Sequence, residues 1–206
     1  LLVCDVGGGT TDLTLVGVSE EGGELALQRL AVGNHLLVGG DNMDLALAHH
    51  LEKRLAPSGK LEPRQWAVLV RTCRQVKETL LGDSAPEQLT VNLPGAGSRL
   101  IGGGLHVEVT REEVRELLVE GFFPRVKLDE RPASRRSGFQ EFGLPYAPDP
   151  AVTRYLAAFL TAHRHVALEE SEQTADHDTA RPDVVLFNGG LFESPLLRER
   201  LLEVLQ

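Results

Sequence analysis

The sequence predicts an α/β fold in which a mixed segment interrupts a sheet. Apolar runs typical of buried strands occur near both ends of the chain, LLVCDV at residues 1–6 and DVVLFNGG at 183–190. Between them lie helix-like runs and a further pair of strand-like runs. A chain that leaves its sheet and later returns to it indicates a main subdomain with a second, α+β subdomain inserted.

Three strands are expected at the start of the chain. The apolar run at 1–6 is followed by the turn GGGTTD and by LTLVGV at 13–18, which we expect to return antiparallel to the first strand. Gly22 and Gly23 make the next turn, and ELALQRLAV at 24–32 reads as the third strand.

Two helices are expected to follow. Apolar residues recur every four positions across 41–56 and predict a helix, with Asp41 as its expected cap. Pro63 is suited to the first turn of a longer helix, which we expect to end at about Leu81, before a glycine.

The rest of the inserted segment mixes strands with a helix. LTVNLP at 89–94 and GLHVEVT at 104–110 read as strands. Thr110 and Glu113 have the spacing of a capping box, which predicts a helix directly after the second strand.

The last part of the chain returns to the main sheet. Residues 124–149 have no clean period and hold four prolines, so we expect a long loop there. A helix is expected from Asp149, the strand at 183–190 follows, and Ser194 with its following proline opens a final helix.

The composition is that of an ordinary globular protein. The 206 residues are 42% hydrophobic and 25% charged, and the net charge of −9 argues against nucleic acid and anionic membranes as partners, because both would repel the chain. No apolar run approaches the ~18 residues of a membrane span, and no signal peptide is visible. Cys4 and Cys73 are too few for a disulfide scaffold, so we expect two buried free thiols and a cytoplasmic protein.

The turn between the first two strands carries the strongest chemical signal, DVGGGTTD at residues 5–12. Three glycines let backbone amides surround an anion without Cβ clashes, and Thr10 adds a hydroxyl donor. Asp5 and Asp12 flank the turn, where they could hold the waters of a hydrated Mg²⁺. The pattern predicts a site for a terminal phosphoryl group. The alternative is a glycine-rich hairpin whose aspartates only cap the turn.

DVGGGTTD resembles the second phosphate motif of the actin-like ATPase superfamily, in the form found in DnaK-type heat shock protein 70 chaperones. Three further segments resemble the same family, in its order: GNHLLVGGDNMDLALAHHL, VRTCRQVKETLLG and VVLFNGGLFESPLL. The resemblance implies lobe II of a nucleotide-binding domain, with an actin-like (ribonuclease H-like) lower subdomain at 1–39 and 124–206 and an inserted upper subdomain at 40–123.

The resemblance also implies a role for each matching position. Asp5 would orient or deprotonate the attacking water, and Asp5 and Asp12 would serve Mg²⁺ or a monovalent ion. The β- and γ-phosphates of ATP or ADP would be bound by Gly7, Gly8, Gly9 and Thr10. The ribose and adenine would lie against Gly39, Gly40, Asp41, Lys77, Gly189 and Gly190.

The sequence departs from the family at the adenine end. Leu191 stands where many members have Ser, and Glu193 stands where they have an Arg that stacks on the base. On the long helix, Arg74, Glu78 and Leu81 replace a Glu, a cation and a Ser of the family pattern. A Glu cannot replace Arg in stacking, because its charge has the wrong sign. Affinity and base preference are therefore left open.

The resemblance implies that a first lobe precedes Leu1 and that a peptide-binding domain follows, with co-chaperones as further partners. We expect this segment alone to have negligible ATPase activity, because phosphoryl transfer needs groups from several directions. The leading function is the nucleotide-binding lobe of an ATP-driven chaperone. The alternatives are a non-hydrolysing relative that serves as an interaction scaffold, and a sugar kinase or filament protein of the same superfamily.

Overall fold

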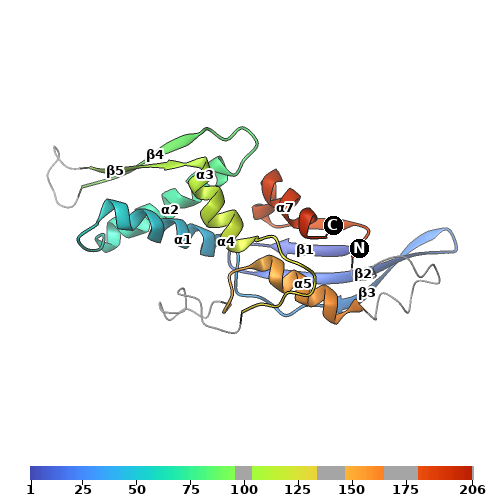
Figure 1. Cartoon of the computed structure of the whole chain (residues 1–206). Coiled ribbons are helices and arrows are strands. Elements are labelled where there is room, and N and C mark those ends of the chain that lie inside the picture. Colours follow the sequence, from blue (N-terminus) through green and yellow to red (C-terminus); the bar gives the residue numbers. More distant parts are fainter. Residues whose placement is uncertain (96–103, 134–146, 165–180, 206) are drawn as a thin grey trace.

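A four-stranded sheet forms the base of the molecule, with strand order β3-β2-β1-β6 (Figure 1). The strands are β1 (Leu2–Val6), β2 (Thr11–Glu21), β3 (Glu24–Val32) and β6 (Val185–Asn188). β1 pairs antiparallel with β2 and parallel with β6, so the chain does leave the sheet and return beside its first strand. This computed structural model describes residues 1–95, 104–133, 147–164 and 181–205.

One side of β1 belongs to the core. Leu2, Cys4 and Val6 are fully buried, whereas Val3 and Asp5 between them are only partly buried. Helix α5 (Val152–Ala162) packs near β2, and helix α7 (Pro195–Leu205) follows a 3₁₀ turn, η3 (Gly190–Glu193), that contacts β1. Because side chains alternate between the two faces along a strand, Val3 and Asp5 project from the more open face of the sheet.

A second group of helices and strands lies to one side of the main sheet (Figure 1). It contains two packed helices and a two-stranded antiparallel sheet. Its elements are α1 (Gly40–Leu55), α2 (Pro63–Leu80), β4 (Gln88–Leu93) and β5 (Leu105–Thr110), followed by a helical stretch made of α3 (Arg111–Val114), the π-helical turn η1 (Arg115–Val119) and α4 (Glu120–Phe122).

The mixed α/β class expected from the sequence is confirmed, and so are the six expected strands. The capping box is confirmed as well, because the Glu113 amide donates to Thr110 Oγ1 over 3.2 Å and the Thr110 amide donates to Glu113 Oε2 over 3.4 Å. The described parts of the expected long loop, 124–133 and 147–149, contain no helix or strand, and residues 134–146 lie outside the described residues.

The expected cap of α1 is wrong. The Gly39 amide donates to Asn42 Oδ1 over 2.8 Å, whereas the Asp41 carboxylate is hydrogen-bonded to Arg74 on α2. The helix begins at Gly40, so Asp41 lies inside its first turn rather than at the capping position, and its carboxylate pairs with Arg74.

Cys4 and Cys73 are free and buried, as expected. Burial raises the pKa of each thiol to about 12, and a neighbouring aspartate adds to the shift, so neither cysteine is a reactive thiolate at neutral pH. Across the described residues, no helix combines the length and the apolar character that a bilayer crossing requires.

Candidate functional site

The hairpin at residues 7–10 joins β1 to β2 and presents open backbone amides. The Gly7 amide donates to the Thr10 carbonyl over 2.9 Å, which closes the turn. Within the described residues, the amides of Gly8, Gly9 and Thr10 donate no hydrogen bond, and both of these glycines are exposed. Unpaired amides in an exposed turn are available to an anion.

Two carbonyls of the same hairpin accept hydrogen bonds from amides at the beginning of α1. The Gly40 amide donates to the Gly7 carbonyl over 3.0 Å, and the Asp41 amide donates to the Gly8 carbonyl over 2.7 Å. A Cβ at Gly39 would lie 2.6 Å from both carbonyl oxygens, so no other residue fits there without displacing the hairpin. The first turn of α1 therefore fixes the hairpin with its amides free.

Asp5 and Asp12 lie directly opposite each other in the β1–β2 register. Residues paired in this way project from the same face of a sheet with Cβ atoms about 5 Å apart. Each carboxylate has a neighbour that the sequence analysis missed: Asn188 Nδ2 donates to Asp5 Oδ2 over 2.9 Å, and His35 Nδ1 lies 2.8 Å from Asp12 Oδ1.

Two carboxylates beside a turn with unpaired amides are a donor set that suits Mg²⁺. This ion is typically held by one or two carboxylates, several waters and the substrate's phosphates. No cluster of three or more possible metal ligands occurs among the described residues, so a site made entirely of protein ligands is not present in that part of the chain. The residues fit a metal that arrives with a phosphate.

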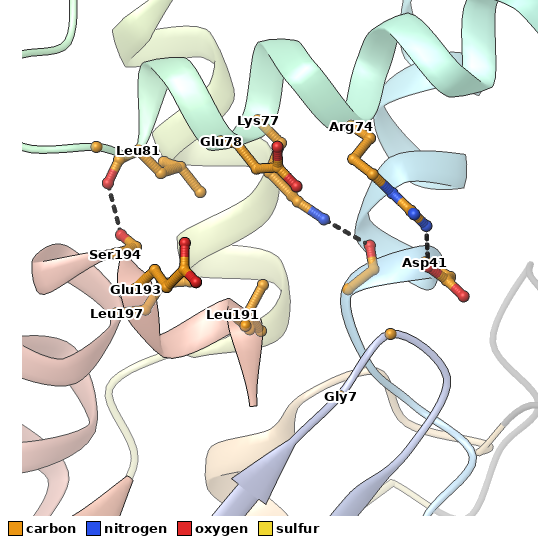
Figure 2. A pocket seen from close by; sticks show the side chains of 14 residues that line it. Gly7, Asp41, Arg74, Lys77, Glu78, Leu81, Leu191, Glu193, Ser194 and Leu197 are labelled. Atoms are coloured by element: carbon orange, nitrogen blue, oxygen red, sulfur yellow. Dashed lines mark hydrogen bonds and ion pairs between the residues drawn. The ribbon is translucent and has the colours of Figure 1, made fainter. Parts of the chain in front are cut away.

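A pocket of about 510 Å³ begins at the hairpin and extends between α2 and η3 (Figure 2). Six of the positions predicted from the sequence line it: Gly7, Gly8, Gly40, Asp41, Lys77 and Gly190. The other six, Asp5, Gly9, Thr10, Asp12, Gly39 and Gly189, lie outside its lining. The remaining lining residues are Arg74, Glu78, Leu81, Gly82, Leu191, Glu193, Ser194 and Leu197.

A network of ion pairs supports the middle of this pocket. Lys77 Nζ donates to the Gly40 carbonyl over 2.9 Å and lies 2.6 Å from Asp44 Oδ1. Arg74 Nε donates to Asp44 Oδ2 over 3.0 Å, and Arg74 Nη2 donates to Asp41. The hydrogen bond to Asp44 and the charges of both aspartates raise the pKa of Arg74.

The network ties α2 to the first turns of α1. Lys77 is buried, and its ammonium faces Gly40 and Asp44 within the protein. Asp44 is almost completely buried and was not predicted as a site residue. The sequence signal that could have found it is the pairing of two acidic positions in the first turns of α1 with two cations on the facing helix.

The far end of the pocket is built around η3. Gly189, just before it, has φ +90°, and a Cβ there would lie 2.2 Å from the Val6 carbonyl oxygen. Ser194, just after it, donates through Oγ to the Leu81 carbonyl over 2.5 Å, which joins η3 to the end of α2. The side chains lining this end are therefore held on two connected elements.

Comparison with known proteins gives the chain's family. A family model described as "Hsp70 protein" matches residues 1–133, so the chain belongs to the Hsp70 family. The chain is also similar to a protein named "Chaperone protein HscA homolog" from Pseudoalteromonas atlantica, with 28% identity over 120 residues. That match covers 58% of this chain and 18% of the relative, so the chain spans a small part of the relative's length.

Proposed function

Since the chain belongs to the Hsp70 family, we propose that it is the second lobe of the nucleotide-binding domain of a chaperone ATPase. Members of this family generally bind ATP or ADP with Mg²⁺. The proposal includes the actin-like arrangement, with a lower subdomain at 1–39 and 124–206 and an inserted upper subdomain at 40–123. Family membership favours this function over that of a sugar kinase or a filament protein.

One observation carries the proposal: an exposed hairpin with open amides stands at the mouth of a pocket, next to two paired carboxylates. The amides of Gly8, Gly9 and Thr10 are available to a polyphosphate because the carbonyls of the turn are already bound by α1. A buried turn with paired amides would have argued against phosphate binding. The nucleoside would then extend along the pocket past Gly40 and Lys77 toward Gly190.

Asp5 and Asp12 are assigned to the metal-bound end. They would hold the Mg²⁺ through its waters, and the ion would neutralise phosphate charge during transfer. Asp5 would also orient the attacking water, and the Asn188 amide fixes one of its oxygens for that purpose. A single lobe supplies these groups from one side only, so we expect turnover to require the first lobe as well.

Single-turnover ATP hydrolysis by the full-length protein tests the proposal. Replacing Asp5 by Ala is expected to lower the rate by about 100-fold or more, because a group that orients or deprotonates water typically contributes that much. The matched control is Asp129→Ala, an exposed aspartate that does not line the pocket, which should leave the rate unchanged.

The same experiment separates the proposal from its main alternative. ATP binding without any turnover would favour a non-hydrolysing interaction scaffold, an alternative motivated by the altered adenine end. Absence of nucleotide binding would refute the proposed function altogether.

A further inference from the structure

The segment between β3 and α1 holds His35 beside the start of β2. Thr11 and Leu36 exchange two backbone hydrogen bonds, of 2.9 and 3.1 Å. On the other side of His35, the Gly33 amide donates to the Leu13 carbonyl over 2.8 Å. The backbone of His35 is therefore fixed along β2 independently of its own side chain.

The imidazole of His35 donates a hydrogen bond to Asp12. His35 Nδ1 lies 2.8 Å from Asp12 Oδ1. An ionised carboxylate accepts hydrogen bonds and has none to donate, so Nδ1 carries the hydrogen. Within the described residues, no other group is hydrogen-bonded to the Asp12 carboxylate. One of its oxygens is therefore oriented by His35, and the other can accept a hydrogen bond from water.

Asp5, which lies opposite Asp12 in the strand register, is oriented in the same manner. Its donor is the side-chain amide of Asn188 on the neighbouring strand β6. An amide carries no charge, and an imidazole can donate a hydrogen bond without carrying one. In the part of the chain that the structure describes, neither aspartate has a lysine or an arginine within ion-pair distance. The two donors therefore orient the carboxylates without cancelling the negative charge that a cation requires.

We propose that His35 is a positioning residue for the Mg²⁺ that accompanies a nucleotide, and that it acts through Asp12; the proposal rests on the nucleotide-binding function proposed above. A carboxylate that holds a hydrated ion must present its oxygen in a fixed direction, and a hydrogen bond from an outer group supplies that direction. An unsupported Asp12 side chain would lose rotational freedom when the ion binds. His35 removes this cost because it orders the carboxylate beforehand.

The size of the effect follows from the loss of such an outer partner. Removing a group that orients a metal-binding side chain typically lowers metal affinity by about 10- to 100-fold. The side chains of His35 and Asp12 are 62% and 45% exposed, so water can replace part of the lost hydrogen bond. We therefore expect the lower end of this range, about 10-fold.

The test is isothermal titration of the full-length protein with ADP, once in Mg²⁺ and once in EDTA. The ratio of the two affinities measures the contribution of the ion. His35→Leu is expected to lower this ratio about 10-fold and to leave the affinity in EDTA unchanged. His35→Asn should restore the ratio, because asparagine carries a donor nitrogen on Cγ, as histidine does. His106→Leu is the matched control, because His106 is exposed on β5 and does not line the pocket.

A double variant tests whether His35 acts through Asp12. In a protein that already carries Asp12→Ala, His35→Leu should lower the ratio no further, because two residues that act as one unit are not additive. A further loss in the double variant would overturn the route through Asp12.

The outcomes separate this proposal from the proposed function. A ratio that His35→Leu leaves unchanged or raises would overturn the role of His35 and leave nucleotide binding intact. A ratio that stays low in His35→Asn would overturn the hydrogen bond as the cause. If the unaltered protein bound no ADP, or bound it equally well without Mg²⁺, the metal-bound end of the proposed function would fall together with this proposal. Both histidines are exposed, so their substitution should leave the melting temperature unchanged.

Discussion

Replacing Asp44 should show how much more a buried ion pair contributes to stability than an exposed one. Its carboxylate is 2% exposed and receives both Lys77, over 2.6 Å, and Arg74, over 3.0 Å. Replacing Asp44 by Ala leaves the Lys77 ammonium, itself 7% exposed, with the Gly40 carbonyl as its remaining partner among the described residues. A buried charge that loses its counter-ion is strongly destabilising.

The expected loss is about 3–5 kcal/mol of unfolding free energy. For a domain of this size, that loss corresponds to a decrease in melting temperature of about 6–20 °C. Asp41→Ala provides the matched comparison, because Asp41 contacts the same arginine but is half-exposed. An exposed ion pair contributes at most about 1 kcal/mol, so this second variant should melt within a few degrees of the unaltered protein.

Thermal and urea denaturation followed by circular dichroism measure both losses on the same protein. The far-ultraviolet signal follows the helices that this network joins, α1 and α2. If Asp44→Ala cost no more than Asp41→Ala, the burial of Asp44 would not control the energy of the network. That result would refute a structural ion-pair role for Lys77.

Two further predictions concern backbone geometry and pH. Gly189→Ala should lower the unfolding free energy by at least about 2 kcal/mol, because the backbone has φ +90° and the new Cβ would lie 2.2 Å from the Val6 carbonyl oxygen. Gly190→Ala is the control: its Cβ would meet no atom within 4 Å, so its unfolding free energy, measured in the same urea titration, should be close to that of the unaltered protein. The hydrogen bond from Arg200 lowers the pKa of Glu120 below 4.5, so this pair stabilises the fold above the unfolded-state pKa and loses its effect as the pH falls through the folded-state value. Glu120→Gln should therefore be destabilising by about 1 kcal/mol at pH 7 and the difference should shrink in acid; a constant difference down to pH 3 would contradict this assignment.

The strands and helices could be predicted because their signals are local. Buried runs, glycine turns and apolar periodicity lie within a few residues of one another, and β3 at Glu24–Val32 and α2 from Pro63 agree closely with the expected bounds. The Thr110 capping box is equally local, since its two partners are three residues apart.

The partners within the candidate site could not be predicted in this way. Asn188 meets Asp5 across 183 residues of sequence, and His35 meets Asp12 across 23. Such contacts depend on which strands become neighbours and in which register, and local patterns do not determine either. The expected cap of α1 failed because the helix begins one residue earlier, at Gly40, so that Asp41 lies within its first turn and pairs with an arginine of another helix.

One end of the pocket is formed by backbone and the other by side chains. This difference determines at which end substitutions are tolerated. The hairpin end consists of backbone, and a single Cβ at Gly39 would collide with two carbonyl oxygens at 2.6 Å. The far end consists of exposed side chains such as Glu78 and Glu193, which can be replaced without moving the main chain. The hairpin end is therefore constrained by the fold, whereas the far end can change through single side chains, and it is at these side chains that the sequence departs from the family pattern.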